Sequence, residues 1–156
     1  MIQRKQTIYL ALALLSFVPL FIFPFAKFPL GTDITCYIGV LGLQNLDGFT
    51  KFNYMFIVMQ ILTTLFISLV GVTIFMYKKR PLQIRFCAFA LLINAFMIAA
   101  MFFTGSMITK AVLSDASLVS YLWPAYVPIV TLFPIRMALQ AIRRDEAMVK
   151  SLNRLR

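Results

Sequence analysis

Between Tyr54 and Tyr77 the chain reads YMFIVMQILTTLFISLVGVTIFMY, and none of these residues carries a charge. A helix of about 20 apolar residues crosses a hydrocarbon core of about 30 Å, so this stretch is long enough to span a bilayer. Inside lipid the backbone polar groups must bond to one another, which predicts a helix. An aromatic ring at each end is typical of residues at the two membrane surfaces.

Three further apolar stretches have a similar length: Thr7–Ala26, Phe86–Ile108 and Leu118–Ile135. The 156 residues are 62% hydrophobic and 13% charged, whereas soluble domains carry about 25% charged residues. We therefore predict an all-α membrane protein with four transmembrane helices in residues 1–142. An amphipathic cytoplasmic helix is expected in residues 143–156.

The net charge of +10 is distributed unevenly over the expected loops. Short loops rich in Lys and Arg stay in the cytoplasm, which predicts that both termini are cytoplasmic. The basic residues are expected to contact anionic lipid headgroups, and nucleic acid is not expected because no recognition motif is present. The cytoplasmic side would hold Arg4, Lys5, Lys78, Lys79, Arg80, Arg85, Arg136, Arg143, Arg144, Lys150, Arg154 and Arg156, and the other side Lys27, Lys51 and Lys110.

The longest predicted loop, Lys27–Asn53, lies on the outer side. Its glycines alternate with β-branched and aromatic residues, which favours a short hairpin or an extended segment on the outer surface. Asp47-Gly48 is a plausible turn. Prolines in the first and fourth spans predict kinked or unwound helix there. These prolines are Pro19, Pro24, Pro124, Pro128 and Pro134.

The sequence lacks the residues that most catalytic and metal sites use. It contains no histidine, the commonest general base and metal ligand. No acidic residue lies inside a predicted span, where a proton relay or a cation path would need one. A P-loop and a dinucleotide fingerprint are both missing. We therefore expect no catalytic residue, metal or cofactor, and a protein that is not an enzyme.

Asn94 is the most polar residue expected at depth in the membrane. An interhelical hydrogen bond, worth about 0.6 kcal/mol on average, is the favoured interpretation. The small residues Thr64, Ser68 and Gly71 on the second span predict close helix packing. If Asn94 has a functional role instead, the protein would be a small transporter or channel subunit that acts as a homo-oligomer, with Asn94 lining its pore.

The segment after Pro134 alternates apolar and charged residues at close to helical spacing, which predicts an amphipathic helix. Glu146 and Lys150 have the i, i+4 spacing of a stabilising pair. Because Asp145 and Glu146 interrupt the basic residues, the tail suits a protein partner as well as an anionic lipid surface. Both interpretations stay open.

The two ends of the chain carry motifs that resemble a known family. They read MIQRKQTIYL at residues 1–10, IRRDE at residues 142–146 and VKSLNRLR at residues 149–156. These motifs are similar to those of a membrane family of Bacteroidota labelled domain of unknown function 4293, although Asn153 stands where that pattern has an acid. The resemblance implies four spans with both end motifs near the cytoplasmic face, and it supplies no activity.

Because both motifs are expected at one face, the first and fourth spans are predicted to be neighbours with their ends in contact. Arg4 or Lys5 is then expected to pair with Asp145 or Glu146. The favoured function is an accessory or interaction subunit that docks through its cytoplasmic ends onto another membrane protein complex. The candidate interaction residues are Gln3, Arg4, Gln6, Arg143, Asp145, Glu146 and Arg154.

Overall fold

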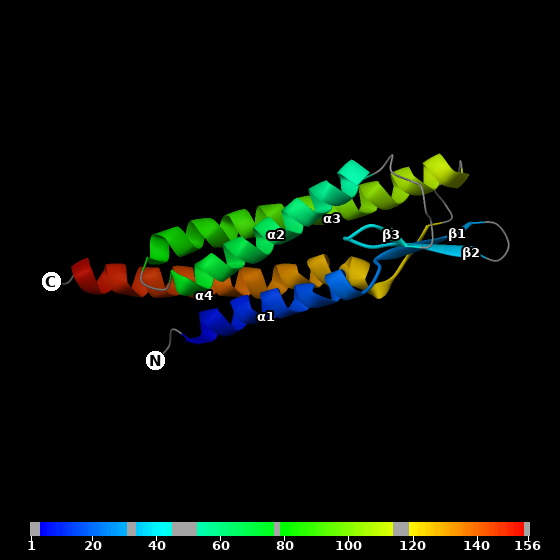
Figure 1. The fold of residues 1–156 in the computed structure, drawn as a ribbon. Coiled ribbons are helices and arrows are strands. Elements are labelled where there is room, and N and C mark those ends of the chain that lie inside the picture. The colour runs from blue at the N-terminus through cyan, green and yellow to red at the C-terminus, as the bar shows by residue number, and fades with distance from the viewer. Residues whose placement is uncertain (1–3, 31–33, 45–52, 77–78, 114–118, 155–156) are drawn as a thin grey trace.

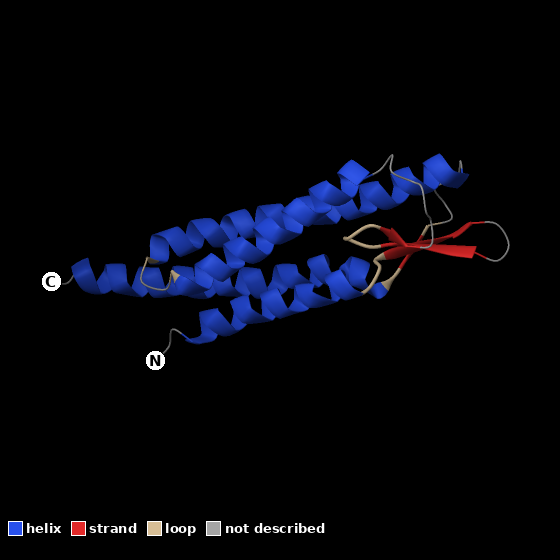
Figure 2. Ribbon diagram, viewed as in Figure 1, coloured by secondary structure: helices blue, strands red, loops and turns tan. Residues whose placement is uncertain are grey.

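The computed structural model describes residues 4–30, 34–44, 53–76, 79–113 and 119–154. Four helices run side by side as a bundle (Figure 1), and a small antiparallel sheet covers one end of it (Figure 2). We call this the sheet end. The opposite end, where α1 begins and α4 continues past the bundle, is called the terminal end. The helices are α1 (Arg4–Ile22), α2 (Asn53–Phe75), α3 (Arg80–Leu113) and α4 (Val127–Arg154).

Three helical segments are long and apolar enough to cross a membrane. They are Asn53–Phe75, Arg80–Val112 and Trp123–Ser151, and α1 contributes the shorter apolar helix Gln6–Ile22. The prediction of a mostly helical chain is confirmed, and three of its helices have the length and apolar composition that a membrane span needs. A fourth span in α1 stays a prediction.

The sheet has the strand order β3-β2-β1-β4. The predicted hairpin is confirmed, because β1 and β2 pair antiparallel over five residues each. The all-α prediction was incomplete, since it left no place for the pairing of β1 with β4, which lies far along the chain. The turn predicted at Asp47-Gly48 falls outside the described residues. The strands are β1 (Ala26–Leu30), β2 (Ile34–Ile38), β3 (Leu43–Gln44) and β4 (Ser120–Tyr121).

The prediction that the first span extends to Ala26 was wrong, because α1 ends at Ile22. Pro24 has no N–H and cannot continue the helical hydrogen bonds. The next amide, that of Phe25, donates instead to the carbonyl of Ile38 at 2.8 Å and so joins the sheet. The predicted loss of helix in the outer part of this segment therefore takes the form of a turn into β1.

The boundaries Leu118–Ile135 of the fourth span were also wrong. After β4 the chain forms one 3-10 turn, η3 (Trp123–Tyr126), and only then begins α4 at Val127. Two of the three prolines lie at these helix starts, where a missing N–H costs nothing, and Pro134 lies inside α4. Because α4 continues to Arg154 without a break, the predicted division at residues 142/143 corresponds to no interruption of the helix.

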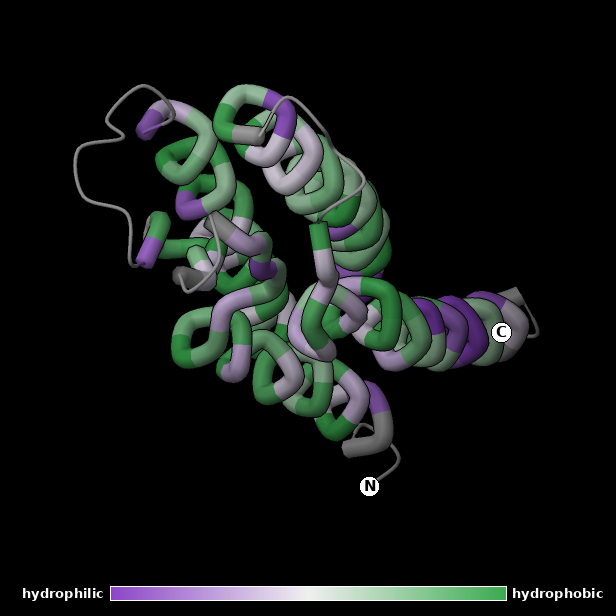
Figure 3. Tube along the Cα trace, turned by 90° about the vertical axis from the view of Figure 1, so that its right-hand side faces the viewer, coloured by the Kyte–Doolittle hydropathy of each residue, from purple (hydrophilic) through white to green (hydrophobic). Residues whose placement is uncertain are grey.

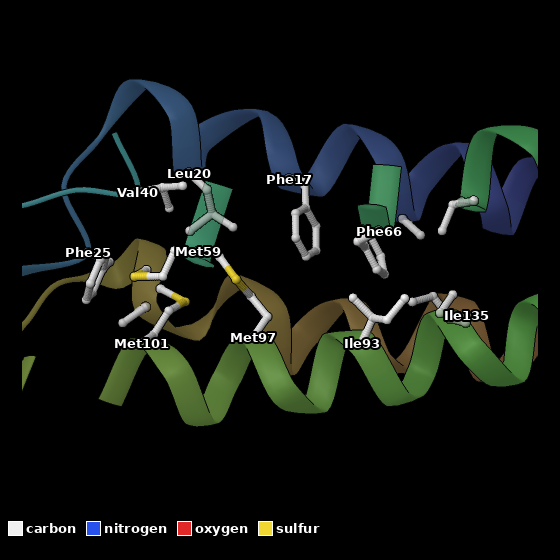
Figure 4. Packing of buried hydrophobic residues seen from close by; sticks show 14 of the residues in the cluster. Phe17, Leu20, Phe25, Val40, Met59, Phe66, Ile93, Met97, Met101 and Ile135 are labelled. Carbon is white, nitrogen blue, oxygen red and sulfur yellow. The ribbon is translucent and has the colours of Figure 1, made fainter. Parts of the chain in front are cut away.

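An apolar core runs between the four helices (Figure 4). Phe17 of α1 stacks on Phe66 of α2, with 4.2 Å between the ring centroids. Met59 of α2, Met97 of α3 and Ile135 of α4 contribute side chains to the same core, and all three are fully buried. Helix α1 packs against α4, and α3 packs against both α2 and α4. The predicted proximity of the first and last helices is thus confirmed.

Candidate interaction site at the terminal end

The two terminal motifs meet between the first turn of α1 and the charged part of α4. Gln6 is 8% exposed, and its Nε2 donates a hydrogen bond to Oδ2 of Asp145. The amide lies on the buried face of α1, because Gln6 and Leu10 are one helical turn apart and both are buried. The end contact that the sequence predicted is therefore present, with Gln6 as the partner of Asp145.

Glu146, the other acid named for the predicted pairing of the ends, forms an ion pair within its own helix. Its Oε1 lies 2.9 Å from Nζ of Lys150, in the i, i+4 arrangement predicted from the sequence. The Lys150 side chain is 73% exposed, so the pair adds only a few tenths of a kcal/mol. Arg143 is exposed. All of Gln3 and the side chains of Arg4, Lys5 and Arg154 lie outside the described residues, and their pairing stays a prediction.

A half-open groove of about 310 Å³ lies beside the contact between Gln6 and Asp145. The sequence analysis missed most of its lining. Arg144, and not its neighbour Arg143, faces the groove. Helix periodicity was the available signal, because residues 137, 141, 144 and 148 recur every three to four positions and share one face. The lining residues are Gln6, Tyr9, Met137, Gln140, Ala141, Arg144, Asp145 and Met148.

A second side-chain contact at the terminal end joins α2 to α3. Nε2 of Gln83, near the start of α3, donates to the carbonyl of Thr73 at 2.9 Å. Gln83 is 3% exposed, and its Oε1 has no hydrogen-bond partner among the described residues. This amide satisfies a carbonyl near the end of α2, where helical acceptors lose their donors.

Asn94 makes the interhelical hydrogen bond that the sequence favoured. It is fully buried, and its Nδ2 donates to the carbonyl of Pro128 in α4 at 2.8 Å. A second polar contact at depth joins α1 to α4, where the hydroxyls of Ser16 and Thr131 lie 2.8 Å apart. Both contacts involve α4, so each of them holds this helix against a neighbour.

The small residues of α2 face away from the bundle. Ser68 is exposed and donates to the carbonyl of Thr64 in its own helix at 2.7 Å. A Cβ added at Gly71 would meet nothing within 4 Å. The face that packs inside the chain holds Met59, Thr63, Phe66, Val70 and Thr73. A packing role for Ser68 and Gly71 stays a prediction, and it would concern a second chain.

The sheet end is closed by close contacts between α3 and the sheet. A Cβ added at Gly105 would lie 3.0 Å from the hydroxyl oxygen of Tyr121, and this hydroxyl donates to the carbonyl of Phe102 at 3.3 Å. Burial raises the pKa of the Tyr121 hydroxyl and of the Cys36 thiol in β2 above their ordinary values. Neither group therefore ionises readily at neutral pH.

A family model described as "Domain of unknown function (DUF4293)" matches residues 2–155, which is nearly the whole chain. Comparisons with curated proteins and with solved structures found no match.

Proposed function

The chain belongs to the DUF4293 family, and on that premise we propose that it is a four-span protein of the bacterial inner membrane that docks, through its cytoplasmic end, onto another membrane protein complex. We propose further that it has no enzymatic activity, since a chain without histidine lacks the commonest catalytic base.

Exposed apolar side chains around the bundle support a fourth span in α1. Large hydrophobic residues that face water in such number would favour aggregation, whereas in lipid they need no cover. Helix α1 has the same kind of outward surface as the three longer helices. Its exposed apolar residues are Ile8, Leu12, Leu15, Val18, Phe21 and Ile22.

The distribution of charge supports the orientation. The start of α1, the turn before α3 and the charged part of α4 all lie toward the terminal end (Figure 1), and the purple, hydrophilic part of α4 points away from the sheet (Figure 3). Lys79, Arg80 and Arg143 belong to this end, and Lys27 belongs to the sheet. Basic residues are retained on the cytoplasmic side, so the terminal end is the cytoplasmic one.

Labelling of two engineered cysteines in intact cells tests the topology. Ser120→Cys places an exposed thiol at the sheet end, and Ser151→Cys places one on the tail of α4. A membrane-impermeant maleimide should label the first variant in intact cells and the second only after permeabilisation. The native Cys36 and Cys87 are buried and give a low background. The reverse labelling pattern would overturn the orientation.

The contact between Gln6 and Asp145 is the observation that carries the docking proposal. It fixes α4 against the start of α1, so the remaining turns of α4 extend from the bundle in a defined direction. Met148 and Val149 lie on this extension and are 53% and 40% exposed. Apolar residues between charges, on a helix held at one end, are what a partner with a hydrophobic groove recognises.

Photo-crosslinking from a single position tests the docking. A photoreactive residue at Val149 should yield a discrete adduct with one membrane protein, and the same residue at Phe133, which is 70% exposed at membrane depth, should not. Removal of residues 147–156 should abolish copurification of that protein while retaining Asp145 and its bond to Gln6. Lipid adducts alone at Val149 would contradict docking and would favour an anchoring tail.

A groove on the outside of α2 favours a second candidate function, a small transporter or channel subunit in an oligomer. It has a volume of about 380 Å³, and the exposed residues Thr64 and Ser68 give it polar groups on the outer face of α2. In an oligomer these groups would face a neighbouring copy. A Ser68→Cys variant that forms no disulfide-linked dimer in oxidised membranes would count against this candidate.

A further inference from the structure

The described residues that line the groove at the terminal end include one positive side chain, Arg144, and one negative side chain, Asp145. The amides of Gln6 and Gln140 and the hydroxyl of Tyr9 add neutral polar groups, and the rest of the lining is apolar. A volume of about 310 Å³ lies at the lower limit of small-molecule pockets, which is about 300 Å³. The groove therefore has room for a small polar group that carries charges of both signs.

An apolar track leads from the groove toward the middle of the bundle. On α4 the side chains of Val130, Phe133 and Met137 follow one another at intervals of three and four residues, and they are 60%, 70% and 48% exposed. The next positions on this face line the groove, with Arg144 two turns beyond Met137. One helix face thus joins an exposed apolar strip to a polar groove. A phospholipid fits such a surface, with its acyl chain along the strip and its headgroup in the groove.

The charges of the groove select among headgroups. The guanidinium of Arg144 matches the planar, two-point geometry of a phosphate. A lipid with net negative charge would also place that charge beside Asp145. The carboxylate of Asp145 already accepts the amide of Gln6, and it has further lone pairs for another donor. A headgroup that carries an ammonium group close to its phosphate can bond to Arg144 and to Asp145 at the same time.

We propose that this groove binds the headgroup of a zwitterionic aminophospholipid of the bilayer, with its phosphate at Arg144 and its ammonium at Asp145. The acyl chain lies along Val130, Phe133 and Met137. The proposal rests on the proposed function in one respect, since that function places the terminal end at a membrane surface. It does not depend on the docking of a protein partner.

Native mass spectrometry of the full chain in detergent tests the proposal. The purified protein is mixed with phosphatidylethanolamine, phosphatidylglycerol and phosphatidylcholine that have identical acyl chains. Phosphatidylethanolamine should be retained most. Arg144→Ala should lower its retention about tenfold, the loss expected for one hydrogen bond to a charged group. The matched control is Arg143→Ala, which removes the same charge from the neighbouring exposed position. Equal losses in the two variants would overturn the proposal.

Asp145→Asn tests the second charge. The amide oxygen of the variant can still accept from Gln6, so the end contact is kept, but the negative charge is lost. Preference for phosphatidylethanolamine over phosphatidylglycerol should disappear in this variant. The control is Glu146→Gln, whose native carboxylate pairs with Lys150 outside the groove lining and whose loss should leave the preference unchanged.

Two further results would overturn the proposal. One is retention of phosphatidylglycerol by the native chain equal to that of phosphatidylethanolamine, because this would show attraction to positive charge alone. The other is displacement of the lipid by water-soluble glycerophosphoethanolamine at equal concentration, because the acyl track would then contribute nothing. The experiment contains no partner protein, so its failure is distinguishable from a failure of crosslinking at Val149.

Discussion

The bundle is closed in two different ways at its two ends. At the sheet end β1 pairs over five residues with β2 and over two with β4, and the amide of Leu122 donates to the carbonyl of Phe25 at 2.8 Å. At the terminal end the side chain of Gln83 joins α3 to α2, beside the backbone bonds of the turn between those helices, and the side chain of Gln6 joins α1 to α4. Among the described residues, the segments next to α1 and α4 are thus joined by backbone bonds at the sheet end, whereas the two helices are joined by a side-chain bond beside an open groove at the terminal end.

Because of this difference, we infer that the sheet end mainly determines the stability of the bundle and that the terminal end mainly determines what the protein binds. The backbone bonds of the sheet and the buried side chains packed beneath it, such as Phe28, stabilise the folded chain at the sheet end. At the terminal end the hydrogen bond between α1 and α4 depends on the amide of Gln6, and the groove beside it leaves charged groups within reach of a ligand. We therefore expect substitutions at the sheet end to affect unfolding, and substitutions at the terminal end to affect binding.

Phe28→Ala should give the largest loss of stability. Phe28 lies in β1 and is 1% exposed, and removal of a buried phenyl ring costs about 3–5 kcal/mol. Reversible unfolding of the chain in detergent measures this free energy. Phe75→Ala is the control, because Phe75 is 83% exposed and its loss should change little. Equal effects in the two variants would show that the sheet does not stabilise the bundle.

Gly105→Ala should lower stability by about 1–3 kcal/mol, the usual range for overpacking. The new Cβ would lie 3.0 Å from the hydroxyl oxygen and 3.2 Å from Cε1 of Tyr121, at the contact between α3 and the sheet. The matched control is Gly71→Ala in α2, where a Cβ meets nothing within 4 Å. That variant should be unchanged or gain up to about 1 kcal/mol, since alanine favours a helix.

Gln6→Ala should cost about 1 kcal/mol, the ordinary net value of a hydrogen bond, because the groove lets water reach the Asp145 carboxylate. In the same variant the yield of the Val149 crosslink should fall by a larger fraction than the free energy of unfolding, because the end of α4 is no longer held in a fixed direction. Gln140→Ala, which removes an exposed amide from the same groove, is the control and should not alter stability. A larger loss of unfolding free energy for Gln6→Ala than for Phe28→Ala would show that the terminal end, and not the sheet end, contributes more to stability.

Hydropathy was sufficient to predict that the chain is mostly helical. Together with the distribution of charge, it also predicted that the two termini lie at the same end, because apolar length and charge are local properties of the sequence. It could not predict the pairing of β1 with β4. That pairing uses two residues of β4, Ser120 and Tyr121, far from β1 in the sequence, and two residues are too few to form a periodic pattern.

The sequence also failed to separate inner from outer helix faces. In water a helix shows its buried face by apolar periodicity, but in lipid both faces are apolar. The small residues of α2 were therefore assigned to helix packing, whereas Thr64 and Ser68 face outward in this chain. For the same reason helix periodicity could place Arg144 on one face with Met137, Ala141 and Met148, but it could not show that this face lines a groove, which depends on how α4 packs.

Asn94→Ala should give the smallest measurable loss, about 0.6 kcal/mol and at most about 1.7 kcal/mol, which is the range of hydrogen bonds inside membrane bundles. The bond joins α3 to Pro128 in the first turn of α4, which starts near the sheet end. Because the sheet already holds this end, α4 should keep its place without the bond. Ser68→Ala, which removes an outward-facing hydroxyl bonded within its own helix, is the control. A loss above about 2 kcal/mol, measured by the same reversible unfolding, would mean that α4 depends on this hydrogen bond and is not held in place by the sheet alone.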